Sequence, residues 1–188
     1  VTETDPQVEG EPPLPVEAID DTASRTTELL NQFIAAGREL IKDRDQANHL
    51  TLRGWSTRPS LPQLPELWKL RAAACTVYPM YRGLARLVGM ESIDGGDSLQ
   101  TQYEALERHW DDYDFFFVHY KATDAAGEDG DFNRKVEAIA EFDRQLPQLL
   151  ALKPDVLIIA GDHSTPATLA AHSWHPVPFL LHAEHAVP

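Results

Sequence analysis

The sequence has 188 residues, a length that suits one domain or one domain with part of a second. A hydrophobic content of 43% is enough for a buried core, and the net charge of −14 argues against nucleic acid or an anionic membrane as partner. No apolar stretch approaches the ~20 residues of a membrane span. With Cys75 as its one cysteine, the chain cannot form an internal disulfide, and this cysteine usage suits a cytoplasmic protein. Cys75 lies in an apolar run, which predicts a buried, inert thiol.

The N-terminal part of the chain is expected to contain little regular structure besides one helix. Residues 1–21 are rich in proline and acids and predict a loop. A helix is predicted over 24–42, and 48–53 alternates weakly, as a short strand does. Residues 55–65 carry three prolines and are typical of a connector. The apolar positions that carry the helix prediction are Leu29, Leu30, Phe33, Ile34, Gly37, Leu40 and Ile41.

From about residue 70, strand-like and helix-like patterns alternate along the chain. Strands are expected at 72–77, 115–119, 156–160 and 177–181, and helices at 81–88, from Ser98 through Trp110, and from Asp131. This alternation predicts an α/β fold with a mostly parallel sheet flanked by helices. The run Val156–Ala160 is nearly all apolar, which favours a parallel strand buried on both faces.

Two clusters of polar residues follow directly after two of these strands. Ligands of open α/β sheets bind beyond the carboxyl ends of the strands. Asp124 and Glu128, after the first strand, are spaced i, i+4 and face the same way if the segment is helical. Asp162 and His163 follow the second strand, and His172 is placed to close a site with Asp124 and Glu128. Carboxylate and imidazole groups together suit Mn²⁺, Zn²⁺ or a similar ion.

Each of these residues also has a structural interpretation. The carboxylates can cap helices, the histidines can lie on the surface, and His119 can be a core residue or a partner of a ligand. Ser164 and Thr165 are positioned as nucleophiles, yet such a turn after a strand is more typical of a helix cap. Lys121 is either a phosphate-binding or a solvated lysine. Arg53 and Arg82 each precede a glycine and are either surface arginines or bidentate partners of a phosphate or carboxylate.

At these residues the chain resembles a known family. The run from Gly161 to Pro166, followed by His172 and Pro176-Val177-Pro178, resembles the archaeal-type cofactor-independent phosphoglycerate mutases of the alkaline phosphatase superfamily. Lys121-Ala122-Thr123-Asp124, with the glycines and acids that follow, resembles the other metal block of the same family. Weaker similarities are Thr4-Asp5-Pro6, Ala47-Asn48-His49-Leu50, Leu52-Arg53-Gly54, Arg82-Gly83-Leu84-Ala85 and Gly89-Met90.

The resemblance implies part of an alkaline-phosphatase-like core with a site for two divalent metal ions. These are usually Mn²⁺, with Zn²⁺, Co²⁺ or Mg²⁺ as alternatives. One ion would be held by Asp124, the residue at position 128 and His172. The other would be held by Asp162, His163, an aspartate and a nucleophilic serine. Glu128 stands where many members have histidine, and glutamate is also an oxygen ligand of Mn²⁺.

The activity implied by the resemblance is the interconversion of 3-phosphoglycerate and 2-phosphoglycerate in glycolysis and gluconeogenesis, through a phosphoserine. Arg53, Arg82 and Lys121 would bind substrate. No stretch here matches the block that carries the serine, so the catalytic residue is expected outside this chain. The chain is therefore expected to be a C-terminal fragment that is inactive alone and needs the missing N-terminal half.

The same resemblance divides the chain. Residues 1–58 would be the remnant of an inserted α/β domain that clamps the substrate, and 59–188 part of the metal-binding core. Two other hypotheses stay open. One is a relative in the same superfamily that acts on other phosphate or phosphonate esters, and the other is a catalytically incomplete module that only binds metal.

Overall fold

The structure is a computed structural model that describes residues 1–8 and 10–185, and it divides into two compact units, Val1–Ser60 and Leu61–Pro188. The sequence placed a domain boundary between residues 58 and 59, and the functions expected of the two parts remain predictions. Among the described residues, none of the helices combines the length and apolar character needed to cross a bilayer.

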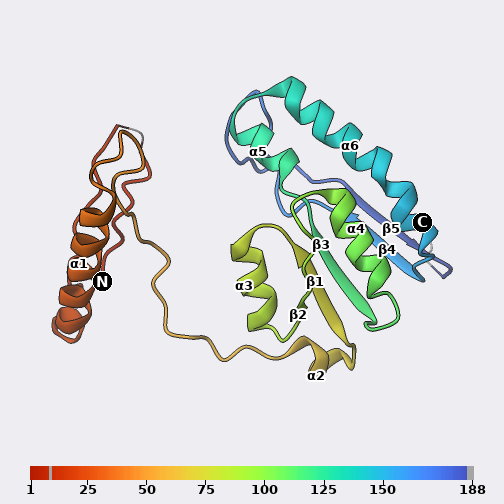
Figure 1. The fold of residues 1–188 in the computed structure, drawn as a ribbon, viewed down its shortest axis with the longest axis horizontal. Coiled ribbons are helices and arrows are strands. Elements are labelled where there is room, and N and C mark those ends of the chain that lie inside the picture. Colours follow the sequence, from red (N-terminus) through yellow and green to blue (C-terminus); the bar gives the residue numbers. More distant parts are fainter. Residues whose placement is uncertain (9, 186–188) are drawn as a thin grey trace. The chain divides into compact units, whose positions relative to one another are not determined.

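The first unit is built around one helix. A 3₁₀ turn, η1 (Asp21–Ala23), leads into α1 (Ser24–Ile41), which agrees with the predicted helix (Figure 1). The strand expected at 48–53 is absent from the described residues of this unit. Instead, Leu52 and Thr4 form two hydrogen bonds with each other. The Thr4 amide donates to the Leu52 carbonyl at 2.9 Å, and the Leu52 amide donates to the Thr4 side-chain oxygen Oγ1 at 2.6 Å. In a β-ladder both hydrogen bonds would join backbone groups. Here the Thr4 hydroxyl accepts one of them in place of the Thr4 carbonyl, so no strand forms.

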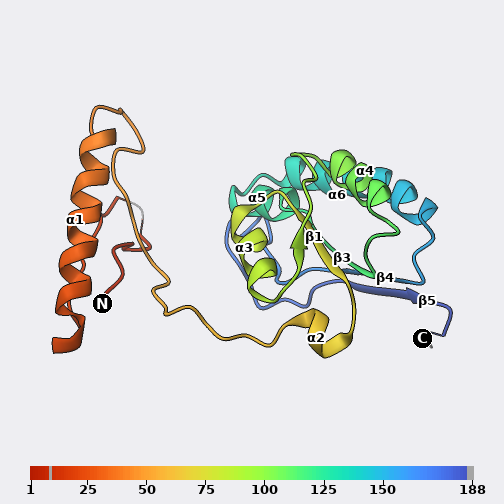
Figure 2. The same cartoon turned by 60° about the horizontal axis from the view of Figure 1, so that its bottom comes forward.

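The second unit is an α/β fold, as predicted, and its three-stranded parallel sheet has the order β2-β1-β3. Figure 2 shows α4 and α6 together on one face of this sheet. Thr76 and His119 are register partners, so β1 and β3 end side by side. The elements in chain order are α2 (Leu64–Trp68), β1 (Ala72–Thr76), α3 (Pro79–Leu87), β2 (Glu91–Ser92), α4 (Leu99–Arg108), β3 (Phe115–His119), α5 (Ala122–Glu128), α6 (Phe132–Ala151), β4 (Val156–Ala160) and β5 (Phe179–Ala183).

Local sequence explains where the helices begin. Ser98 caps α4 in a reciprocal capping box with Thr101, and Asp131 caps α6 by accepting the Arg134 amide at 2.9 Å. Between α4 and the sheet lies a core of Ala73, Cys75, Ile93, Ala105 and Leu106. Burial raises the pKa of the Cys75 thiol to about 11, so the thiol is inert, as expected.

The last two strands differ from the prediction. β4 was expected to be a buried parallel strand, but it pairs antiparallel with β5 in a separate two-stranded sheet. β5 itself covers Phe179–Ala183, two residues later than expected. Val156 and Ile158 are each 56% exposed, so the described residues cover one face of β4 and leave the other open. The apolar composition therefore predicted the strand correctly but its burial and its pairing incorrectly. The short elements α2 and β2 were not anticipated.

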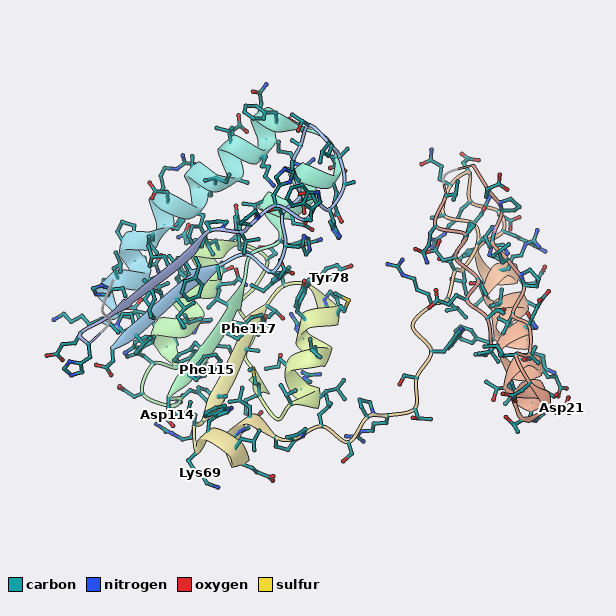
Figure 3. The ribbon with its side chains drawn as sticks, turned by 180° about the vertical axis from the view of Figure 1, so that it is seen from behind. Asp21, Lys69, Tyr78, Asp114, Phe115 and Phe117 are labelled. Carbon is teal, nitrogen blue, oxygen red and sulfur yellow. The ribbon has the colours of Figure 1, made fainter. Side chains whose placement is uncertain are left out.

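An ion pair joins the segments that lead into β1 and β3. The backbone amide and Nε of Arg71 donate to Asp114 Oδ2 at 2.8 and 3.1 Å, and Nη2 donates to Oδ1 at 2.8 Å. These hydrogen bonds lower the pKa of Asp114 from 3.8 to about 2. Figure 3 shows Asp114 at the end of the sheet opposite to Tyr78. The pair therefore aligns the amino ends of the two neighbouring parallel strands.

Acidification should remove the contribution of this pair. Because the folded-state pKa of Asp114 is depressed, its stabilisation is complete above the ordinary pKa and is lost as the pH falls toward 2. We expect Asp114→Asn to lower the urea midpoint at pH ~5 and to have much less effect at pH ~2.5. An equal difference between the two proteins at both pH values would contradict this assignment.

Two glycines form a matched pair for testing the core. A Cβ on Gly95 would lie 2.2 Å from Cys75 Sγ and 3.2 Å from the Gln102 Cα, whereas a Cβ on Gly83, within α3, meets nothing within 4 Å. We expect Gly95→Ala to destabilise the protein by about 1–3 kcal/mol through overpacking. Gly83→Ala should stabilise it by about 0.5–1 kcal/mol, because alanine is the better helix former. Urea denaturation measures the free energy of unfolding of both variants. A change in the same direction in both would contradict the prediction.

Candidate metal centre

The polar residues singled out in the sequence gather beyond the strand ends of the second unit. α5 starts three residues after β3 ends, and its first turn carries Asp124. The loop that follows β4 carries His163 and His172. The i, i+4 spacing of Asp124 and Glu128 falls within α5, so the condition that this segment be helical is met.

Three of the predicted ligands form one compact cluster. Asp124, His163 and His172 each offer a ligand atom, and these atoms lie within 4.8 Å of one another. Asp124 Oδ1 is 3.8 Å from His163 Nδ1 and 3.9 Å from His172 Nε2. The two imidazole rings lie with their centroids 3.9 Å apart. The sequence had assigned His163 and His172 to different ions, and the structure brings both to the same carboxylate.

A single β-bridge explains how residues nine positions apart meet. Ser164 and Ser173 pair antiparallel, and the Ser173 amide donates to the Ser164 carbonyl at 2.8 Å. This bridge closes the loop directly beside both histidines. The Ser164 hydroxyl donates to the His175 carbonyl at 3.0 Å, so it is engaged by backbone. This position fits a structural role for Ser164 better than that of a nucleophile.

Asp124 is the most enclosed carboxylate of the cluster, with a side chain that is 17% exposed. Burial acts to raise its pKa, but the hydrogen bonds from Lys121 and Thr165 outweigh burial, and the net pKa is lowered. The Thr165 hydroxyl, which is itself buried, also lies 3.1 Å from His163 Nδ1. Thr165 therefore orients two candidate ligands, and this role is a third one besides the cap and the nucleophile.

Close packing holds the Thr165 segment against α5. A Cβ on Gly127 would lie 2.1 Å from the Thr165 carbonyl oxygen, so only glycine permits this approach. Lys135 Nζ, from α6, donates to the carbonyls of Thr123 and Thr165 at 3.1 and 2.8 Å. The two segments that carry the ligands are thus tied together by one glycine and one ammonium group. Gly127 belongs to the run that resembles the metal block of the family, whereas Lys135 was not picked out in the sequence.

Asp162 lies on the other side of His163. Its Oδ2 accepts the Tyr81 hydroxyl at 3.0 Å and is 3.6 Å from His163 Nε2, while its Oδ1 accepts the His163 amide at 3.1 Å. Burial acts to raise the pKa of Asp162, but the Tyr81 hydrogen bond and the neighbouring groups lower it overall. His163 therefore presents one ring nitrogen toward Asp124 and the other toward Asp162.

Lys121 and Glu128 complete the rim of the cluster. Glu128 Oε1 is 3.3 Å from His172 Nε2, and its Oε2 is 3.5 Å from Lys121 Nζ. Lys121 also pairs with Asp124. Burial acts to lower the pKa of Lys121, but the two carboxylates outweigh it, so the pKa is raised and the ammonium stays charged. This cation lies where an anionic group bound at the cluster would meet it.

The two predicted arginines are placed differently. Arg82 lies on α3, where Nη2 donates to the Thr76 carbonyl at 2.9 Å and Nε is buried without a partner among the described residues. Arg53 lies in the first unit, where its Nη1 is 3.6 Å from Asp5 Oδ2. Its side chain is 64% exposed. Neither arginine forms a bidentate pair with a carboxylate in the described part of the chain, so both keep donor groups that could bind a substrate. Their substrate-binding role stays a prediction.

The donor set of the cluster fits a divalent ion. Two imidazoles and three carboxylates converge, and one ammonium group balances only part of their charge. Oxygen and imidazole nitrogen ligands suit Mn²⁺ and Zn²⁺, and the chain brings no second thiol that would favour a softer ion. These residues can hold a metal and present it to an anionic ligand next to Lys121.

Thr165 provides a test of how the ligands are oriented. In Thr165→Val the shape is kept, but the Asp124 carboxylate loses a buried hydrogen-bond donor, so we expect a loss of about 1–3 kcal/mol in the free energy of unfolding. Thr165→Ser keeps the hydroxyl and should lose much less. Urea denaturation of both variants without added metal measures this. Equal losses in the two would assign the effect to the methyl group rather than to the hydrogen bond.

Comparison with known proteins places this geometry in a family. The family described as the metalloenzyme superfamily matches residues 39–187. A probable 2,3-bisphosphoglycerate-independent phosphoglycerate mutase of Thermus thermophilus is 53% identical over 186 residues, which are 97% of this chain and 46% of that protein. One of Thermotoga neapolitana is 51% identical over 181 residues, which are 96% of this chain and 45% of that protein. The resemblance seen in the sequence is confirmed, and the chain spans about half the length of these relatives.

Solved structures agree with the α/β fold. A protein of Pyrococcus horikoshii matches with a TM-score of 0.73 and 29% identity, over 87% of this chain and 49% of that one. A cofactor-independent phosphoglycerate mutase of Thermoplasma acidophilum matches with a TM-score of 0.57 and 24% identity, over 98% of this chain and 49% of that one, which concerns the fold alone. With a family match over most of its length and a cluster of side chains that could hold a metal ion at its strand ends, this chain belongs to the metalloenzyme superfamily.

Proposed function

We propose that the polypeptide carrying this sequence is a cofactor-independent phosphoglycerate mutase, an isomerase that interconverts 3-phosphoglycerate and 2-phosphoglycerate. This chain would supply the metal-binding residues Asp124, Glu128, Asp162, His163 and His172. The observation that carries the proposal is the convergence of Asp124, His163 and His172 within 4.8 Å. It is supported by 51% and 53% identity to probable 2,3-bisphosphoglycerate-independent phosphoglycerate mutases of Thermotoga neapolitana and Thermus thermophilus.

The geometry suggests how two ions would share the cluster. His163 has Nδ1 toward Asp124 at 3.8 Å and Nε2 toward Asp162 at 3.6 Å. We propose that Asp124, Glu128 and His172 serve one ion and Asp162 and His163 the other, with His163 between them. We propose Mn²⁺, because the set mixes carboxylate oxygens with imidazole nitrogens. Zn²⁺, Co²⁺ and Mg²⁺ are the alternatives.

The metal ions would lower the pKa of a hydroxyl nucleophile and offset charge on the transferring phosphoryl group. The resemblance assigns that nucleophile to a serine outside these 188 residues. Within the chain, Lys121 stays protonated beside Asp124 and would hold the phosphoryl oxygens in place. Arg82 and Arg53 would bind the phosphate or the carboxylate of the glycerate. Thr165 would keep Asp124 ionised and oriented throughout.

Activity of point variants tests the proposal. In the intact polypeptide with Mn²⁺, we expect conversion of 3-phosphoglycerate to 2-phosphoglycerate to be lost in both Asp162→Asn and His172→Ala. His182→Ala is the control, because this exposed histidine lies on β5, outside the ligand cluster. Full activity in either ligand variant would contradict the metal assignment.

The same assay separates the alternatives. Hydrolysis or transfer of other phosphate or phosphonate esters, without mutase activity, would indicate another phosphoryl-transfer enzyme. Mn²⁺ binding by calorimetry without any turnover would indicate a module that only binds metal. Turnover by the 188 residues alone would place the nucleophile inside this chain, with Ser164 and Thr165 the first candidates.

A further inference from the structure

We infer that Tyr81 is a positioning residue that fixes Asp162 for metal binding through the hydrogen bond from its hydroxyl to Asp162 Oδ2. The two atoms are 3.0 Å apart. The inference rests on the proposed metal site and adds to it a residue from α3, an element that contributes none of the proposed ligands. The sequence did not predict a role for Tyr81, because in the run Tyr81-Arg82-Gly83 only the arginine is a typical ligand of phosphate or carboxylate.

Asp162 needs such a contact because it is the more open of the two ligand carboxylates beside His163. Its side chain is 61% exposed, against 17% for Asp124. It follows Gly161, so the preceding residue offers no side chain to confine it. The amide of His163 holds Oδ1 at 3.1 Å, and the Tyr81 hydroxyl holds Oδ2. Together the two donors set both the position and the plane of the carboxylate.

Tyr81 is itself held in place by the ends of the parallel strands. Its ring stacks on His119, the last residue of β3, with centroids 3.8 Å apart and planes at 26°. The Tyr78 ring is also near, with its centroid 6.1 Å from that of Tyr81. Buried Gln102 donates to the carbonyls of Cys75 and His119 at 3.0 and 3.1 Å, which fixes the strand ends beneath this stack. A rigid platform therefore carries the hydroxyl.

The hydroxyl acts as a donor. An ionised carboxylate has no proton and can only accept, so the phenol O–H of Tyr81 donates the hydrogen bond to Asp162 Oδ2. One lone-pair direction of Oδ2 is used in this way, and the remaining ones stay available beside His163 Nε2. Hydrogen-bond partners of metal-binding carboxylates commonly contribute ~10–100-fold to metal affinity. We expect an effect of that size here.

The test is Mn²⁺ binding by calorimetry to the intact polypeptide and to Tyr81→Phe. This substitution removes only the hydroxyl and keeps the stacked ring. We expect the affinity of one ion to fall by ~10–100-fold while the other is unchanged. Tyr78→Phe is the matched control: it also removes a phenol hydroxyl at the start of α3, and that hydroxyl makes no hydrogen bond in the described part of the chain.

A double variant shows whether the effect passes through Asp162. In an Asp162→Asn background, Tyr81→Phe should cause no further loss, because the carboxylate that it orients is gone. An additive loss, an equal loss at both ions, or an unchanged affinity in Tyr81→Phe would overturn the inference and leave the proposed function standing. Absence of Mn²⁺ binding by the unsubstituted protein would overturn both. Thermal unfolding without metal, expected to match in the unsubstituted protein, the three single variants and the double variant, shows that a loss of affinity is not a loss of fold.

Discussion

The candidate site is organised around the enclosed carboxylate of Asp124. A partly buried negative charge is stable only where hydrogen-bond donors or cations surround it, and neighbouring segments supply them. Lys121 supplies an ammonium from the start of α5, Thr165 a hydroxyl from the loop after β4, and the two imidazoles approach from the same loop. Burial alone would favour the neutral acid, and it is the hydrogen bonds that keep the pKa below its ordinary value. A site that stays anionic without metal is one that a cation can enter without first displacing a proton.

That arrangement depends on how closely the loop can approach α5. Gly127 leaves room for the Thr165 carbonyl, and Lys135 donates to a carbonyl on each side of the contact. A Cβ at position 127 would move the loop away and separate Thr165 from Asp124. The Ser164–Ser173 bridge then folds the rest of the loop back, so His172 arrives next to His163. The positions of the ligands thus follow from backbone contacts made by residues that carry no metal chemistry themselves.

Residue pattern predicted the parts of this structure that depend on local sequence. The helices at α1, α4 and α6 follow from apolar periodicity and from caps such as Ser98 and Asp131, and the strands β1 and β3 from short apolar runs. The same chemistry singled out Asp124, His163 and His172, which the structure brings together, because carboxylates and imidazoles that follow strand ends can be recognised in the sequence. The partners that orient these ligands were not predictable. Tyr81 and Lys135 are ordinary residues in their own helices, and only the folded chain brings them within hydrogen-bond distance of a segment 30 or more residues away.

The pairing of β4 could not be predicted for a related reason. An apolar run such as Val156–Ala160 indicates a strand that is suited to burial, but it does not indicate which other strand pairs with it. In the structure Val156, Ile158, Leu181 and Phe179 alternate onto one exposed face of the β4–β5 pair, whereas Leu157 is buried on the other. An apolar face of this kind is typical of a surface that packs against protein. Within the described residues, the loop that leaves β4 is held by its contacts with α5 and α6 and by the Tyr81 hydroxyl from α3, and the geometry of the cluster depends on those contacts.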